Sequence, residues 1–429
     1  MKSLRIMFLS LGLCIAALIC FAQDSNGNLV DDVPSIGALN AIKKAYQMTD
    51  LIFMPLDSFV ANPDKVYYGG KEYQGLVYSS VKETHTFVGM DVSFHTFMTA
   101  LHNPRSVMYT ENVSKPPYHG NNCGAYYGTV CSGLVTYALG LKVYQKSYDL
   151  VDSDLMQLVD KQSAEGIQLA DVLWRKGHVA LITGIKRNTK TGKVARVEIS
   201  QALHRGCHRS WKKSEKAFND MLQKGKWKIY RYKNLDDNKD YTPLTDFVAV
   251  GNERLTPFKY NDDICTNRGD KACYIVGDSV ILNIVRGYKE LEIYKDSILC
   301  KTVDVDKDLD IVLRDLAYGD YKARLVKGNK RSDYTYWKII DANVSIDQKK
   351  NIVKFHSENA IPVYAEFCSL SGGRPVNGFF DLSNDDIKNG YVDVSSFSKT
   401  LQTSKYVKVH FECDYGRVTN KPIKWRIKK

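Results

Sequence analysis

The chain has 429 residues, of which 44% are hydrophobic and 25% charged, and its formal net charge is +12 at pH 7. This composition is typical of a globular protein, is too apolar for a disordered one, and at this length predicts two or three domains. Beyond the N-terminal segment there is no sustained heptad, no collagen period and no run of about 18 apolar residues, which excludes coiled-coil, fibrous and multi-span membrane proteins.

Residues 1–22 have the features of a secretory signal peptide. Lys2 and Arg5 precede an apolar run from Ile6 to Phe21, and small residues stand three and one positions before Gln23. The run is shorter than the ~20 residues that a bilayer requires, so no transmembrane anchor is expected. We therefore expect an exported protein, periplasmic or extracellular and associated with the cell wall, whose mature chain begins near Gln23.

Residues 23–243 are predicted to form a first domain that mixes helices and strands. Periodic apolar residues predict helices at Ser35–Tyr46, Ser93–Leu101, Cys131–Gly140, Asp154–Asp160 and Ser214–Gln223. Strands are expected at His178–Ile185, Val194–Gln201 and Trp227–Tyr232, with a polar turn at Lys186–Lys193. The buried face of the first helix is expected to consist of Ile36, Leu39, Ile42, Ala45 and Tyr46.

The C-terminal part of the chain is predicted to be entirely β-structure. Short alternating runs recur at intervals of about ten residues, which is typical of β-sandwiches. We expect two immunoglobulin-like sandwiches, at residues 258–348 and 349–429. Their strands are predicted at Val280–Val285, Leu291–Tyr294, Asp310–Leu313, Tyr321–Leu325, Tyr336–Ile340, Ile352–Phe355, Val363–Phe367, Gly390–Val394 and Val407–Phe411.

One cysteine and one histidine have the placement that nucleophilic catalysis requires. Cys131 begins an apolar helix, where the unpaired N–H groups and the positive end of the helix dipole favour the thiolate. His178 opens a buried strand and is the candidate general base. If Ile185 opposed Val194, His178 would face Gln201, which is therefore the expected orienter of the imidazole. The same register predicts that one face of the two paired strands is apolar and that Glu198 lies on the opposite face.

These residues resemble the NlpC/P60 cysteine peptidases of bacterial cell-wall metabolism. The resemblance covers roughly residues 118–232, about a quarter of the chain, and is carried by the strings Thr129-Val130-Cys131-Ser132-Gly133-Leu134-Val135 and Gly177-His178-Val179-Ala180-Leu181-Ile182-Thr183-Gly184. It implies an α+β, papain-like catalytic domain followed by the two sandwiches. It also implies hydrolysis of peptidoglycan stem peptides, commonly between γ-D-glutamate and a diamino acid, without a cofactor.

The same resemblance suggests residues that contact the substrate. Tyr118 matches the family's substrate-contacting tyrosine and Ser132 matches the serine after the nucleophile. Apart from the resemblance, Tyr78-Ser79-Ser80 and Tyr126-Tyr127 are candidates for the cleft wall because serine and tyrosine can hydrogen-bond a bound peptide; the alternative is that they are turn and packing residues. The chain has Val130 where such enzymes often carry an aspartate that binds the substrate amine, so recognition of that amine must differ. The related CHAP amidases share the order of Cys and His, which leaves the scissile bond open.

Eight cysteines remain after the signal peptide, and export permits disulfides. We expect Cys123 to pair with Cys207, Cys265 with Cys273, and Cys368 with Cys413, although spacing does not determine connectivity. An alternative is a disulfide between Cys123 and Cys131, which would remove the nucleophile. The chain contains no Cys-x-x-Cys pair, so zinc-ribbon and thioredoxin-like sites lack their ligands.

Two other features could indicate a metal site or a binding surface. His204 and His208 are spaced like zinc ligands but lack the glutamate of a metalloprotease helix, so no metal is predicted. The segment 205–233 is basic with interleaved aromatic residues, and the preferred interpretation is a solvated helix face followed by a strand whose aromatic residues alternate into the core. The alternative is a surface that binds anionic glycan; no specific nucleic acid is expected. The alternative to an enzyme is a non-catalytic surface or glycan-binding protein that retains a papain-like scaffold.

Overall fold

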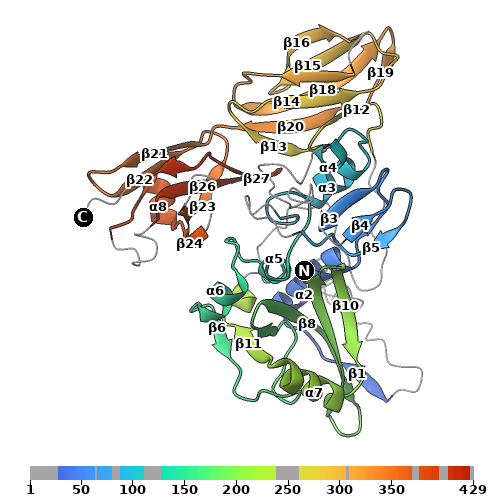
Figure 1. Ribbon diagram of the computed structural model, residues 1–429, viewed down its shortest axis with the longest axis vertical. Helices are drawn as coiled ribbons and strands as arrows, with labels where there is room; N and C mark the ends of the chain where they lie inside the picture. The colour runs from blue at the N-terminus through green and yellow to red at the C-terminus, as the bar shows by residue number, and fades with distance from the viewer. Residues whose placement is uncertain are drawn as a thin grey trace, which may run out of the picture. The chain divides into compact units, whose positions relative to one another are not determined.

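The computed structural model in Figure 1 describes residues 28–62, 65–79, 87–110, 127–237, 260–305, 309–369, 376–395 and 404–425. The chain divides into two compact units. The first unit consists of Met1–Ile42, Ser147–Ser200 and Arg209–Lys239, and the second of Lys43–Lys146, Gln201–His208 and Asp240–Lys429. Residues 43–146 therefore group with the C-terminal β-domains rather than with the rest of the predicted first domain. In the described residues, no helix is long and apolar enough to span a bilayer.

The first unit is built on a seven-stranded sheet in the order β10-β9-β8-β7-β11-β6, with β1 paired to β8. Its strands are β1 (Leu29–Asp31), β6 (Met156–Leu158), β7 (Val172–Arg175), β8 (His178–Asn188), β9 (Val194–Leu203), β10 (Gly206–Lys212) and β11 (Lys228–Tyr232). The helices that accompany it are α2 (Ile36–Thr49), α6 (Ser147–Asp152), α7 (Glu215–Gly225) and the 3₁₀ turn η2 (Leu235–Asp237).

The core of the first unit lies between this sheet and α7. Phe218 and Leu222 of α7 are buried against the apolar side chains of β8 and β9. Ser214 caps the helix by accepting a hydrogen bond from the Ala217 amide. The predicted helix at Asp154–Asp160 is wrong: residues 156–158 form β6, which pairs with β11. Pairing at a sheet edge therefore outweighs the helical pattern there.

The N-terminal part of the second unit carries short strands and three helices. The strands are β2 (Ile52–Phe53), β3 (Phe59–Asn62), β4 (Lys65–Tyr67) and β5 (Tyr73–Gln74), which pair as β2-β5 and β3-β4. The helices are α3 (Phe94–Leu101), α4 (Val107–Thr110) and α5 (Cys131–Ala138). Every residue of α5 is buried, and Gly140, at φ 71°, follows the helix in the left-handed conformation expected after a C-cap.

The first C-terminal domain consists of two sheets around one core. Sheet β12-β14-β17 faces sheet β13-β20-β18-β15-β16, and buried residues of both, including Leu282, Ile293 and Trp337, form a single cluster. The strands are β12 (Ile264–Thr266), β13 (Ala272–Ile275), β14 (Val280–Ile284), β15 (Glu290–Lys295), β16 (Ile298–Asp304), β17 (Asp310–Leu313), β18 (Gly319–Lys327), β19 (Lys330–Arg331) and β20 (Thr335–Ile340).

The second C-terminal domain repeats this arrangement. Sheet β21-β22-β25 and sheet β24-β23-β26-β27 enclose a core that includes Val353, Phe367, Val409 and Trp425. Its elements are β21 (Asn343–Asp347), β22 (Ile352–His356), β23 (Ile361–Cys368), β24 (Val376–Asp381), α8 (Asn384–Asn389), β25 (Tyr391–Asp393), β26 (Tyr406–Cys413), β27 (Gly416–Thr419) and β28 (Ile423–Lys424). Each strand predicted in the two domains overlaps an observed strand. Because β21 pairs with β22, however, the second domain already begins before residue 349.

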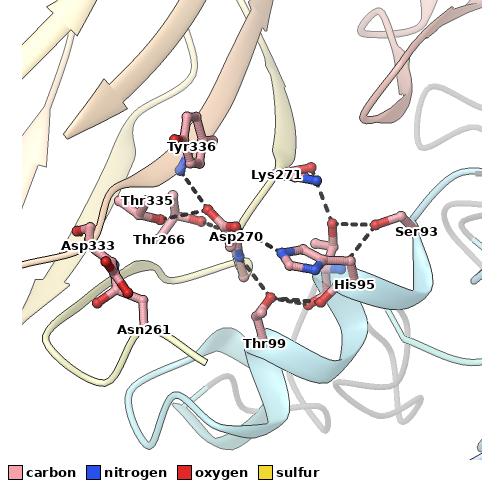
Figure 2. A network of polar contacts seen from close by, with 12 residues as sticks. Ser93, His95, Thr99, Asn261, Thr266, Asp270, Lys271, Asp333, Thr335 and Tyr336 are labelled. Carbon is pink, nitrogen blue, oxygen red and sulfur yellow. Dashed lines mark hydrogen bonds and ion pairs between the residues drawn. The ribbon is translucent and has the colours of Figure 1, made fainter. Parts of the chain in front are cut away.

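Polar contacts attach α3 to the first of these domains (Figure 2). His95 Nε2 lies 2.8 Å from the Asp270 carboxylate, and the Asp270 amide donates to Thr99 Oγ1 at 2.9 Å. The same carboxylate accepts from the Tyr336 amide at 2.6 Å and from the Thr335 hydroxyl at 3.0 Å. One aspartate therefore connects α3 to the strand β20 through both of its carboxylate oxygens.

Candidate active site

Cys131 is the first residue of α5 and is 9% exposed. Val130, in the N-cap position, has extended backbone angles and gives no side-chain hydrogen bond to the first turn. Among the described cysteines, none is disulfide-bonded to Cys131; the alternative partner Cys123 lies outside the described residues. The first-turn amides and the dipole of the helix thus face a thiol, which is the arrangement that favours a thiolate.

A strand-like segment lies directly beside the start of α5. The Ser79 amide donates to the Thr129 carbonyl at 2.9 Å, and the Thr129 amide donates to the Val77 carbonyl at 3.0 Å. Gly128 makes this approach possible, since a Cβ there would come within 2.5 Å of the Ser79 Cβ. Tyr78 belongs to this segment and lies near the Cys131 thiol. Burial raises the pKa of the Tyr78 phenol, and the neighbouring Cys131 raises that pKa further.

Residues 201–208 lie against the same segment. The Cys207 amide donates to the Leu76 carbonyl at 2.7 Å, and the ring centroids of Tyr78 and His204 are 5.2 Å apart. Cys207 is 1% exposed; burial, followed by the nearby Cys131, raises the pKa of its thiol. Of these two cysteines, only Cys131 stands at a helix N-terminus, so Cys207 is the poorer nucleophile.

Ser132 connects α5 to the second C-terminal domain. Its hydroxyl lies 2.8 Å from the Tyr144 hydroxyl. The Tyr144 ring packs against Phe87 at 4.7 Å between centroids and meets the edge of Phe379, on β24, at 5.9 Å. The residue after the candidate nucleophile is therefore held by a tyrosine that packs on a β-sandwich strand.

His178 begins β8 in the first unit and is 7% exposed. Its ring meets Trp227 in a T-shaped contact at 5.5 Å, and Arg175, which pairs with His178 across β7 and β8, stacks over the same indole at 4.8 Å. Trp227 thus restricts the orientation of the imidazole. Cys131 and His178 belong to different units, so their pairing stays a prediction.

The predicted register of β8 and β9 is wrong. Arg187, rather than Ile185, opposes Val194, and Leu181 opposes Ser200. Strand β8 continues to Asn188, so the turn before β9 is shorter than the polar segment Lys186–Lys193 suggested. Two irregularities in the pairing, after Ile182 and after Lys186, also shift the register along β8. The register that placed Gln201 opposite His178 is therefore not present.

Gln201 instead contacts a residue of its own segment, with its Nε2 3.3 Å from His208 Nε2. The predicted division of the two strands into an apolar and a polar face is confirmed. Ile182 and Ile199 lie in the apolar core, whereas Glu198, on the other face, accepts from Thr183 at 3.0 Å and pairs with Arg209 at 3.2 Å.

The expected disulfide partners are also corrected. The Sγ of Cys273 lies 3.2 Å from the Sγ of Cys413, not beside Cys265, which is buried on β12. Cys368 is buried on β23, where its thiol lies 3.5 Å from the Glu366 carboxylate. Spacing along the chain misled here because the closest pair joins two different domains. Cys123, Tyr118 and Tyr126 lie outside the described residues, as does the signal segment.

Sequence reasoning named Tyr78 only as one of several candidates for the cleft wall, and it missed the positions of Cys207 beside Cys131 and of Trp227 beside His178. No local signal marks them, because each contact joins segments far apart in the chain. Within the described ranges, no group of three His, Cys, Asp or Glu side chains is placed to hold a metal ion.

No protein-family model and no curated protein matches the chain. Among solved structures, the chain is similar to the CD2-binding domain of CD58 (7% identity, 36% of this chain and 95% of that one, TM-score 0.18). It is also similar to fibronectin(III)-like modules of Clostridium thermocellum CbhA (10% identity, 38% of this chain and 94% of that one, TM-score 0.18). A third similar structure is the human OSCAR ligand-binding domain (8% identity, 38% of this chain and 96% of that one, TM-score 0.17). TM-scores this low place neither sandwich in a family.

Proposed function

We propose that the protein is an exported cysteine peptidase that hydrolyses amide bonds in peptidoglycan stem peptides. The observation that carries this proposal is the position of Cys131 as the first residue of the fully buried helix α5, which has no side-chain cap. The resemblance of the Cys131 and His178 strings to NlpC/P60 peptidases supplies the substrate class, and the signal-like segment 1–22 supplies the route to the cell wall.

In this reaction the Cys131 thiolate attacks the amide carbonyl, and the first-turn amides of α5 stabilise the oxyanion. His178 takes the thiol proton and then gives a proton to the leaving amine, after which water, activated by the same imidazole, releases the acyl group. Trp227 keeps the imidazole in one orientation by edge contact. With no aspartate at position 130, the amine of the substrate must be recognised by other groups.

Tyr78 is the side chain best placed to meet a substrate bound at the thiol. It is half-buried, and the segment that carries it runs beside the last residues before α5. A phenol whose pKa is raised stays protonated at neutral pH, so it remains a hydrogen-bond donor toward a carbonyl or carboxylate. We assign it to substrate binding, the role that the resemblance gave to Tyr118.

The test uses purified muropeptides that contain the γ-D-glutamyl–diamino acid bond, with products identified by mass spectrometry. Cys131→Ala and His178→Ala should each lower the rate by at least about 10³-fold, because each removes a group that acts in the transition state. Cys300→Ala removes an exposed thiol on β16 and His356→Ala removes an exposed imidazole on β22, so these matched controls should keep the wild-type rate.

A second measurement separates the enzyme from a binding protein. Iodoacetamide at neutral pH should label Cys131 faster than Cys300 in the wild-type protein, and more slowly in His178→Ala. If muropeptides bind but are never cleaved, and Cys131 reacts no faster than Cys300, the protein is a non-catalytic binder and the proposal fails.

A further inference from the structure

Two cysteines from different C-terminal domains meet at the junction of those domains. Cys273 lies on β13 and Cys413 ends β26, 140 positions further along the chain. Their sulfur atoms are 3.2 Å apart and both residues are half-buried. A disulfide needs the sulfur atoms about 2.0 Å apart, so only a small side-chain movement separates the two thiols from a bond.

The backbone on both sides of the pair is held in place. Cys273 is paired with Lys338 in the parallel ladder of β13 and β20, and Cys413 is paired with Gly416 in the hairpin of β26 and β27. Gly416 has a φ of +147°, and a Cβ there would come within 2.3 Å of the Asp91 carbonyl and 3.9 Å of Cys273 Sγ. The close approach of this hairpin therefore requires glycine at position 416, and it places Cys413 beside Cys273 on β13.

A lysine beside the pair adds a second link between the same two domains. Lys338 Nζ lies 3.0 Å from Asp320 on β18 and 2.6 Å from Asp414, the residue after Cys413. A hydrogen bond from Cys273 and the charge of Lys338 lower the pKa of the Cys413 thiol, whereas burial raises that of Cys273. The lysine and the less complete burial favour Cys413 as the thiol that attacks an oxidant.

We propose that Cys273 and Cys413 form a disulfide that fastens the two C-terminal domains to each other. The Cys413 thiolate attacks the disulfide of a thiol oxidant, such as a dithiol oxidase or glutathione disulfide, and releases one oxidant thiolate. Cys273, after losing its proton to solvent, attacks the Cys413 sulfur of this mixed disulfide and displaces the second thiolate. The protein thereby loses two protons and two electrons, and the oxidant disulfide becomes two thiols.

The bond would also steady the part of the second unit that carries Cys131. The Arg417 amide, in the same hairpin as Cys413, donates to the Asp91 carbonyl at 2.9 Å, and the Asp91 carboxylate accepts from the Phe87 amide at 2.7 Å. Phe87 packs on Tyr144, which holds Ser132. The disulfide therefore lies at one end of a series of contacts that leads to the start of α5.

The experiment compares the full-length protein after incubation in a glutathione redox buffer with the same protein in excess dithiothreitol. Peptide mapping without reduction should show Cys273 and Cys413 in one linked pair of peptides, and thermal unfolding should occur about 5 °C higher in the oxidised protein, since the bond closes a long loop. Cys273→Ser and Cys413→Ser should each remove the redox-dependent shift, and Cys300→Ser should keep it.

The comparison of redox states within the wild-type protein does not depend on how well the variants fold. A linkage of Cys265 with Cys273 or of Cys368 with Cys413, or a thiol count that stays constant in the oxidising buffer, would overturn the proposal. The peptidase assignment is tested separately, because dithiothreitol leaves Cys131 a thiol and muropeptide hydrolysis can be followed in either buffer.

Discussion

The helices α3 and α5 both lie in the second unit and both contain eight residues, but they begin in different ways. Ser93 caps α3 by accepting a hydrogen bond from the Thr96 amide at 3.0 Å, and His95 on the same helix binds Asp270. Helix α5 begins after Val130, which offers no such bond, and its first residue is Cys131.

This difference indicates that the two helices serve different purposes. The capped helix uses its polar groups to attach a β-sandwich, so its first turn contributes to stability. The uncapped helix leaves its first-turn amides directed at a thiol, which stabilises the helix less but favours an anion there. The following predictions test this division, beginning with the largest expected change in stability.

The strongest test of α3 as an attachment point is Asp270→Ala. It leaves the Tyr336 amide and the Thr335 hydroxyl without their acceptor and removes the partner of His95, so the free energy of unfolding should fall by about 3 kcal/mol. Urea unfolding measures the change. The control Asp385→Ala removes an exposed carboxylate from the first turn of α8 and should cost about 0.3 kcal/mol. Equal losses in the two variants would contradict an attachment role for Asp270.

Asp91, which connects the segment before α3 to Arg417 on β27 of the second C-terminal domain, should make stability depend on pH. Burial raises the pKa of the Asp91 carboxyl from 3.8 to about 7, with Arg417 opposing the shift and Glu412 and Glu366 adding to it. A raised carboxyl pKa favours the native state at low pH, and this contribution is lost as the pH rises through about 7.

Asp91→Asn does not titrate, so the wild-type protein should lose about 2–4 kcal/mol relative to this variant between pH 4.5 and 8. Chemical unfolding of both proteins across this range gives the difference directly. The prediction fails if the difference in free energy of unfolding between the two proteins stays constant with pH, or if the wild-type protein gains stability relative to Asp91→Asn as the pH rises. Either result would show that the Asp91 carboxylate is already ionised in the native state at pH 5.

The cap of α3 provides a smaller test. Ser93→Ala removes the acceptor of the Thr96 amide and should lower the free energy of unfolding by about 1 kcal/mol. The rate at which iodoacetamide labels Cys131 should stay unchanged, because the substitution acts on a different helix. A slower labelling rate in this variant would show that the two helices are coupled.

The smallest expected change in stability comes from giving α5 the cap that it lacks. Val130→Ser supplies a side-chain acceptor for the first turn and should stabilise the protein by up to about 1 kcal/mol. The same hydroxyl competes with the thiolate for the first-turn amides, so labelling of Cys131 should slow about two- to five-fold. Faster labelling would mean that these amides do not stabilise the thiolate.

The sequence predicted individual elements better than it predicted which residues meet. The strand pattern of both C-terminal domains and the positions of α3, α5 and α7 follow from local periodicity, and the structure agrees with them. In α2 the helix was expected but its buried face was only partly correct: Ile36 is 63% exposed, whereas Ala38 and Ala41 are buried against Ala170. Small side chains there allow a close approach that hydrophobicity alone does not reveal.

The candidate site shows the same limit. Periodicity was enough to place Cys131 at a helix start and His178 at a strand start. The assignment of Gln201 depended on pairing across a hairpin, where bulges change the partner of every later residue without an obvious mark in the sequence. Tyr78, by contrast, came to the thiol through a pairing with Thr129, about fifty positions away along the chain.

Local sequence by itself thus determined where helices and strands begin and which thiol stands at a helix N-terminus, because spacing, caps and breakers act over a few residues. Only the tertiary structure decided that Cys273 meets Cys413, that Tyr144 holds Ser132 and that Tyr78 lies beside Cys131. Those contacts arise from packing between segments far apart in the chain, and their geometry depends on how whole sheets and helices fit together.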